Sequence, residues 1–126
     1  MTESVARTDA SCSLDTSTVT ASYDVAMEEG EEFEMDLYLF AYPSHDAPTT
    51  WDCGPWTRVT ATPPYRCTRE AGQPETATVT LVTTMDPAKT TAPDLKAILD
   101  ATVVLPLEDH RETMATDSST TMCTHD

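Results

Sequence analysis

Apolar and polar side chains alternate along much of this chain. In residues 18–25 and again in residues 33–40, every second side chain is apolar, and most of the side chains between them are acidic or hydroxylic. A period of two places one set of side chains on each face of a strand, so both segments are predicted to be half-buried β-strands. From residue 37 to residue 42 both faces become apolar, which indicates a central strand or one covered by a partner.

Other segments carry the strand signal more weakly. Residues 56–62 and 76–85 are rich in Thr and Val and are predicted to be strands. A Pro-Pro pair ends the first of them, because proline cannot donate to a central ladder. Residues 65–68 are expected to continue this strand beyond a kink, and residues 101–107 to form a final apolar strand.

Two segments break the alternation. Residues 27–32 are mostly Glu and contain Gly30, which readily takes positive φ, so an acidic turn is predicted there. Pro93 suits the first turn of a helix, and an apolar stripe follows it. A short helix is therefore expected from Pro93 to Asp100. Its apolar stripe consists of Leu95, Ile98 and Leu99.

Five or six short strands with proline-rich connections and one short helix predict an all-β (mainly β) protein. The expected architecture is a small antiparallel β-sandwich or barrel. Residues 18–107 are assigned to this domain. Residues 1–17, rich in Ser, Thr and Asp, are expected to form an extended N-terminal arm, and residues 108–126 an acidic C-terminal tail.

The charge of the chain concerns its environment more than its fold. The chain has 22 acidic and 7 basic residues, a formal net charge of −15, 24 Thr, 2 Lys and no Asn. At molar salt the Debye length falls to about 3 Å, which screens self-repulsion, so this composition predicts a protein of a salt-loving microbe. An ordinary acidic protein from a GC-rich genome is the alternative. The negative surface argues against nucleic acid or an anionic membrane as a partner.

No targeting segment is expected from the sequence. Residues 1–15 include acidic residues and no apolar run, unlike a signal peptide, and nowhere do 18 apolar residues follow one another. We therefore expect neither export by a leader nor insertion into a membrane.

Four cysteines allow three disulfide pairings. The expected pairing joins Cys53 to Cys67 across an irregular loop and Cys12 to Cys123 across the two terminal segments. A bridge that closes a loop as short as the first is worth about 3 kcal/mol in the chain-entropy model, which would help a small core.

The sequence also allows two other states of the cysteines. Cys53 and Cys67 with His45, or Cys123 with His125, contain the ligand types of a zinc site, although no two cysteines have the close spacing of common zinc motifs. Unpaired cysteines are also among the most frequently buried residues, so free thiols in the core are a third interpretation.

No motif in the sequence supports catalysis. Ser44, His45 and Asp46 are residue types found in hydrolases, but adjacent residues cannot align as nucleophile, base and orienting acid. The acids of residues 28–36 lack the register of an EF-hand, so a solvated face is expected there. The 3 glycines are too isolated for a phosphate-binding loop. We expect no enzyme, no cofactor and no bound metal.

One stretch of the chain is locally basic. Apart from Asp52, residues 51–69 contain no acid, and they include three Arg and both Trp. Trp, Tyr and Arg are enriched at binding hot spots, so this stretch predicts a contact surface that docks on the acidic face of a neighbouring copy. Its candidate residues are Trp51, Trp56, Arg58, Tyr65, Arg66 and Arg69. The alternative is that the tryptophans fill the core and the arginines pair with local acids.

These features favour a non-enzymatic structural protein that works in an assembly with copies of itself and neighbouring structural proteins. A virion component, such as a capsid decoration, turret, tail or neck protein of a virus of a halophilic microbe, is expected. Such a protein is made in the host cytoplasm and oxidised after release, which reconciles disulfides with the lack of a leader. The alternative is a secreted or cell-surface module that binds protein or glycan through Trp51, Trp56 and Tyr65. A small intracellular zinc-binding protein is a further alternative.

Overall fold

The computed structural model describes residues 2–40, 49–59, 64–84 and 95–125 of the 126-residue chain. Within these ranges the protein consists of strands and connections. The described residues contain no helix that is long and apolar enough to cross a membrane. The strands are β1 (Ser4–Ser13), β2 (Thr18–Ala26), β3 (Glu32–Phe40), β4 (Thr49–Asp52), β5 (Thr57–Arg58), β6 (Tyr65–Thr68), β7 (Thr76–Thr84), β8 (Lys96–Pro106) and β9 (Arg111–Met122).

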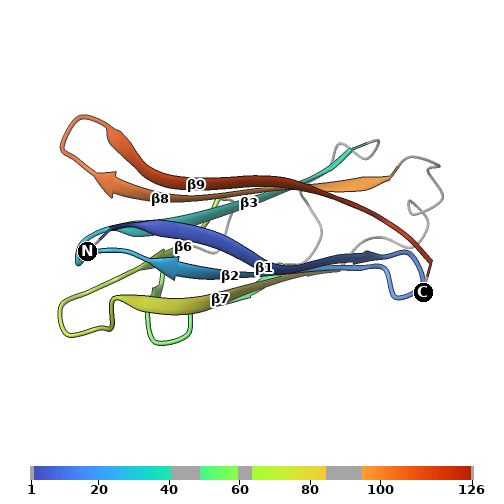
Figure 1. The fold of residues 1–126 in the computed structure, drawn as a ribbon, viewed down its shortest axis with the longest axis horizontal. Coiled ribbons are helices and arrows are strands. Elements are labelled where there is room, and N and C mark those ends of the chain that lie inside the picture. Colours follow the sequence, from blue (N-terminus) through green and yellow to red (C-terminus); the bar gives the residue numbers. More distant parts are fainter. Residues whose placement is uncertain (1, 41–48, 60–63, 85–94, 126) are drawn as a thin grey trace.

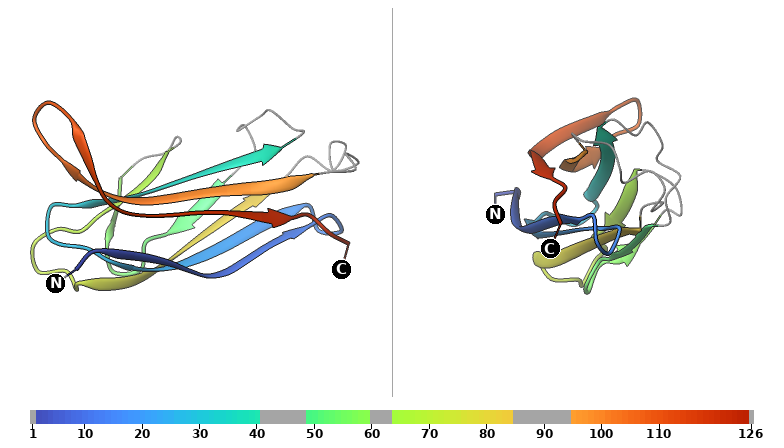
Figure 2. Two further views of the ribbon diagram at one scale, coloured as in Figure 1. Left: turned by 45° about the horizontal axis from the view of Figure 1, so that its top comes forward. Right: turned by 90° about the vertical axis from the view of Figure 1, so that its right-hand side faces the viewer.

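The strands form two antiparallel sheets that lie face to face (Figure 1; Figure 2, right). The order is β1-β2-β7-β4 in the four-stranded sheet and β5-β6-β3-β8-β9 in the five-stranded sheet. Facing sheets bury one side of each strand and leave the other side in solvent, which is the pattern that the alternating sequence requires. The expected all-β class is confirmed, in the form of a sandwich.

The core lies between the sheets and is made by alternate side chains of the central strands. In β2 and in the described side chains of β3 every second residue is buried, which confirms the alternation predicted from the sequence. Complete burial of a Val, Leu or Phe side chain contributes about 1.5–3 kcal/mol. The buried apolar residues of the four longest central strands are Val19, Ala21, Tyr23, Val25, Phe33, Met35, Leu37, Val79, Leu81, Ala97, Leu99, Ala101, Val103 and Val104.

The short helix predicted from Pro93 to Asp100 is wrong. Lys96–Asp100 are the first half of β8, a central strand that pairs with β3 on one side and β9 on the other. Leu95 and Leu99 are buried as a helical stripe would require, but Ala97 between them is buried too, which a strand explains and a helix does not. Pairing on both sides thus overrides the local helix signal.

Tyr65–Thr68 do not continue the preceding strand. They form β6, which runs antiparallel to β5, with Thr57 opposite Thr68 and Arg58 opposite Cys67. The chain therefore reverses direction between the two segments. Residues 60–63, between the two segments, lie outside the described ranges.

The segments expected as an N-terminal arm and a C-terminal tail carry the strands β1 and β9. β1 pairs with β2 at one edge of the four-stranded sheet, and β9 pairs with β8 at one edge of the five-stranded sheet. The two strands run side by side in the same direction (Figure 1), and a parallel bridge joins Ser13 to Thr124 at their ends. The two ends of the chain thus close one side of the sandwich.

Candidate contact surfaces at the sheet edges

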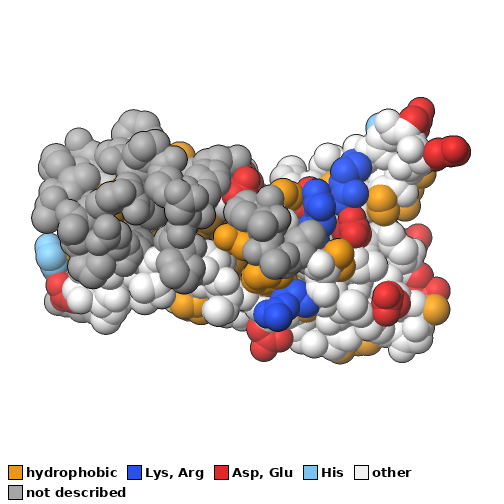
Figure 3. Space-filling model, turned by 180° about the vertical axis from the view of Figure 1, so that it is seen from behind, with side chains coloured by type: hydrophobic (Ala, Val, Ile, Leu, Met, Phe, Trp, Pro, Cys, Tyr) orange, Lys and Arg blue, Asp and Glu red, His pale blue; other side chains and the backbone are white. Residues whose placement is uncertain are grey.

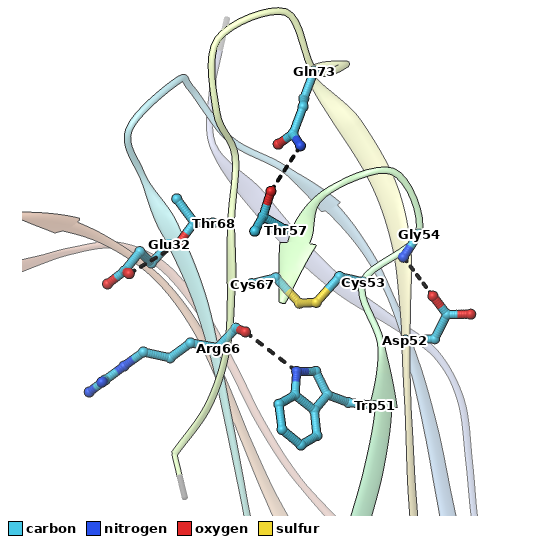
Figure 4. Close-up of a disulfide and its surroundings, with 10 residues drawn as sticks. All are labelled: Glu32, Trp51, Asp52, Cys53, Gly54, Thr57, Arg66, Cys67, Thr68 and Gln73. Carbon is cyan, nitrogen blue, oxygen red and sulfur yellow. Dashed lines mark hydrogen bonds between the residues drawn. A yellow bond between two sulfur atoms is a disulfide. The ribbon is translucent and has the colours of Figure 1, made fainter. Parts of the chain in front are cut away.

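A disulfide joins the two sheets at each side of the sandwich. Cys12 in β1 is bonded to Cys123, directly after β9, and these two strands are edges of different sheets. Cys53 directly follows β4, the other edge of the four-stranded sheet, and is bonded to Cys67 in β6 (Figure 4). These are the two pairs expected from the sequence. The two bonds connect the sheets covalently on opposite sides of the sandwich.

The disulfides bear directly on the other interpretations of the cysteines. All four cysteine sulfur atoms are bonded in the two disulfides, so none is a free thiol or is available as a thiolate ligand for zinc. His45 lies outside the described residues. His125 is exposed and its Nδ1 lies 2.6 Å from Oδ1 of Asp15, so this ring is engaged with a carboxylate at the molecular surface.

The aromatic residues of the expected contact segment are buried. Trp51 is 8% exposed and Trp56 is 4% exposed. The Trp51 indole donates to the Arg66 carbonyl at 3.4 Å, and the Trp56 indole donates to the Pro74 carbonyl at 2.8 Å (Figure 4 for Trp51). Tyr65 is also buried and its ring centroid lies 4.9 Å from that of Trp51. These side chains fill the core beside the Cys53–Cys67 disulfide, as the alternative interpretation of the tryptophans holds.

Arg69 is buried as well and serves the fold. Its Nη1 donates to the Met27 carbonyl at 2.7 Å and its Nε to the Gln73 carbonyl at 3.1 Å. The Arg69 carbonyl also accepts from the amide of Gly30, which has the positive φ expected of this turn, 83°. A charged donor that satisfies buried carbonyls is a strong interaction in a low-dielectric interior. Arg69 therefore fastens the β2–β3 turn to the turn that precedes β7.

Arg58 and Arg66 are the candidate residues that reach the surface. The guanidinium carbon of Arg58 lies 4.8 Å from the centroid of the Trp51 ring, a cation–π contact, and the side chain is exposed. Val59, the next residue, is 48% exposed. Arg66 is half-buried on the outer face of the five-stranded sheet, where its Nε donates to Glu34 Oε1 at 2.9 Å.

Arg111, which local sequence does not single out, organises the same face. It lies at the start of β9 and donates to carboxylate oxygens of both Glu32 and Glu34 on β3, across the intervening strand β8. Figure 3 shows Lys and Arg side chains next to carboxylates on this side of the molecule. One Arg in an acidic tail has no local signature of such a role, because its partners are almost 80 residues away in the chain.

The hairpin between β8 and β9 curls away from the rest of the sandwich (Figure 2, left). Its turn is closed by a hydrogen bond from the Leu107 amide to the His110 carbonyl at 2.8 Å. Leu107 and Met114 are exposed apolar residues of this hairpin. Three of its acidic residues are exposed as well, and they are Glu108, Asp109 and Glu112.

A shallow hollow lies on the outer face of the four-stranded sheet. It has a volume of about 530 Å³ and is lined by residues of β1, β2 and β7 with small or hydroxylic side chains and one carboxylate. That carboxylate, Asp24, accepts a hydrogen bond from Thr78. Within the described parts of the chain, no three His, Cys, Asp or Glu side chains are grouped as a metal site would require. Ser44, His45 and Asp46 lie outside those parts.

Comparison with known proteins adds one structural likeness. No protein-family model matches the sequence, and no curated protein matches it. Among solved structures, the chain is similar to AggA, the major subunit of aggregative adherence fimbriae type I from Escherichia coli. The TM-score is 0.56 at 13% sequence identity, and the match covers 100% of this chain and 98% of that one. At this identity the likeness shows the fold and extends over the whole chain.

Proposed function

We propose that this protein is a non-enzymatic structural subunit that assembles with copies of itself outside the cell or at the cell surface. The observation that carries the proposal is the likeness to a fimbrial major subunit over the whole length of this chain. Because fold alone does not establish function, the proposal also rests on features of this chain.

The disulfides support an extracellular location. Each disulfide joins one sheet to the other, and disulfide bonds form and persist in an oxidising environment. The virion role and the salt-loving host expected from the composition receive no support from the structural comparison. The comparison favours the cell-surface alternative instead, although not as the Trp-based binding module first described, because Trp51 and Trp56 are buried.

The proposal is tested on the protein in its native source. Antibodies raised against the folded chain should label the outside of intact cells in immunogold microscopy, and extraction under non-reducing conditions should release particles larger than one chain. Label confined to the cytoplasm, together with a monomer in such extracts, would refute the proposal. Label on released virus particles would restore the virion interpretation.

Light scattering after size-exclusion chromatography tests self-assembly separately. The oxidised chain should form species whose mass rises with concentration. A chain that stays monomeric over the accessible range would contradict the assembly part of the proposal.

A further inference from the structure

Large exposed apolar side chains gather at the two outer edges of the five-stranded sheet. Among the described residues they are Val59, Leu107, Met114 and Met122. Val59 directly follows β5, and the other three belong to β9 or to the turn before it. β5 and β9 are the first and last strands of this sheet, and neither has a further strand in its ladder in the described parts of the chain. Because β1 runs beside β9 and is hydrogen-bonded to it at Asp117 and just after it at Thr124, the free part of the β9 edge is its hairpin end. Exposed sheet edges of this kind are templates for association with another chain.

The two edges also differ in charge. On the β5 edge, Arg58 is exposed and contacts the Trp51 ring, and it has no carboxylate within ion-pair distance among the described residues. On the β9 edge, Glu108 and Glu112 are exposed, while the neighbouring cation, Arg111, is already engaged by Glu32 and Glu34. Next to β5, the exposed carboxylate of Glu70 accepts a hydrogen bond from the Thr57 hydroxyl at 3.1 Å. The β5 edge therefore offers a free cation, Arg58, beside an apolar side chain, and the other edge offers carboxylates beside apolar side chains.

The edges are level with each other across the sheet. The pairing register places Thr57 opposite Thr68, Thr68 opposite Glu32, Glu32 opposite Val104, and Val104 opposite Thr113. The short strand β5 thus lies at the same height along the strands as the beginning of β9. This is the height of Met114, and Met122 lies at the other end of β9. Four antiparallel steps also give β5 and β9 the same direction, so translation along the sheet sets the β5 of one copy parallel to the β9 of another.

We propose that the hairpin end of β9 in one copy packs against the β5 edge of the next copy. In this contact Leu107 and Met114 meet Val59, and the carboxylates of the hairpin meet Arg58. This inference rests on the proposed function, since it names the surfaces through which the subunits associate. The contact joins two different edges, so it is heterologous and propagates a chain of subunits.

The charges disfavour contacts between identical edges. Two β9 hairpins brought together would oppose Glu108 and Glu112 with the same acids, and two β5 edges would oppose Arg58 with Arg58. Like charges across an interface suppress the wrong partner. The hairpin is also preorganised by Arg111 and by the turn hydrogen bond of Leu107, so little conformational freedom is lost on binding.

The test uses two full-length variants, each altered at one edge. R58E changes the β5 edge, and M114D changes the β9 edge. Under conditions in which the wild type forms chains of subunits, each variant alone should remain monomeric, with association weakened at least tenfold. An equimolar mixture should form a dimer and nothing larger, because one intact edge of each kind remains. M122D adds the same charge to β9 outside the contact and should associate as the wild type does.

The outcomes separate this inference from the proposed function. A cooperative unfolding transition with a midpoint close to that of the wild type, slightly lower for R58E because the contact between Arg58 and Trp51 is lost, establishes that the variants are folded. If R58E and M114D form chains as the wild type does, or if their mixture stays monomeric, the proposed contact is wrong while self-assembly stands. If the wild type itself never associates, both proposals fail.

Discussion

Cys12 and Cys123 are 111 positions apart in the sequence, yet their Cα atoms are 4.5 Å apart and their sulfur atoms are bonded. The disulfide fixes β1 to the end of β9. Two backbone hydrogen bonds also join the chain here. The Leu14 amide donates to the Thr124 carbonyl at 2.8 Å, and the Thr124 amide donates to the Cys12 carbonyl at 3.0 Å. The first and last strands of the chain are thereby held together across the two sheets.

Loss of this disulfide should cost more stability than loss of the other. In the chain-entropy model a loop of roughly 100 residues is worth about 4.7 kcal/mol and one of roughly 15 residues about 3 kcal/mol. The separations here are 111 and 14 residues. We expect the variant C12S/C123S to lower the free energy of unfolding by about 1–2 kcal/mol more than C53S/C67S in urea titrations. Equal losses, or the reverse order, would contradict this expectation.

Replacing Glu31 by Gln should stabilise the protein at neutral pH. Burial raises the pKa of the Glu31 carboxyl; the Glu28 amide, which donates to it at 2.6 Å, opposes the shift, and the negative charges of Glu3 and Glu28 reinforce it. A carboxyl with a raised pKa in the folded state destabilises the fold increasingly as the pH rises through that pKa.

The E31Q variant should therefore unfold at a higher temperature than the wild type at pH 7, and at the same temperature at pH values well below about 4.3, the usual pKa of Glu. Gln keeps an oxygen that accepts from the Glu28 amide. E29Q, an exposed change in the same turn, is the control and should show no such pH-dependent gain. A lower unfolding temperature for E31Q at pH 7 would rule out the burial argument.

Tyr23 should ionise at strongly alkaline pH. Burial raises its pKa to about 12, and the negative charge of Asp117 adds to the shift. A titration of tyrosinate absorbance should contain a component near pH 12 that the Y23F variant lacks, and D117N should move this component toward lower pH. Because the unfolded chain ionises Tyr23 at about pH 10, this residue destabilises the fold between pH 10 and 12, and Y23F should lose less stability there.

Arg69 should matter more for stability than Arg58. The R69A variant removes a charged donor from the Met27 and Gln73 carbonyls, and charge-assisted hydrogen bonds contribute about 1.5–3 kcal/mol each. We expect a loss of about 3 kcal/mol in urea unfolding. R58A removes an exposed cation–π contact worth about 0.5–1 kcal/mol. Similar losses of unfolding free energy for the two variants would show that the buried hydrogen bonds of Arg69 do not stabilise the fold.

The strand alternation shows how far local pattern reaches. In β2 and in the first half of β3 one face of the strand is apolar and the other polar, so a period of two had no competitor and both strands were predicted correctly. At residues 95–100, Leu95, Ile98 and Leu99 fit a helical period while Leu95, Ala97 and Leu99 fit a strand. Local spacing cannot separate these periods over six residues, and pairing with β3 and β9 decided the outcome.

For the candidate contact residues, the sequence could not predict which side chains are exposed. Composition identified a stretch rich in Trp and Arg, but whether a Trp lies in the core or on the surface depends on which segments pack over it. The Pro74 carbonyl that accepts from Trp56 is 18 residues away, and the Met27 carbonyl that accepts from Arg69 is 42 residues away. Arg58 kept a surface position because β5 is an edge strand, a fact set by sheet order.

The sequence by itself thus determined the all-β class, most strand faces and an acidic, disulfide-compatible chain, because these follow from near-neighbour spacing and composition. Only the tertiary structure decided which strands lie at the edges, which of the expected contact residues are buried, and that β5 and β9 lie on the same rows of one sheet. Those features depend on contacts between residues far apart in the chain, whose pairing no local pattern of side chains encodes.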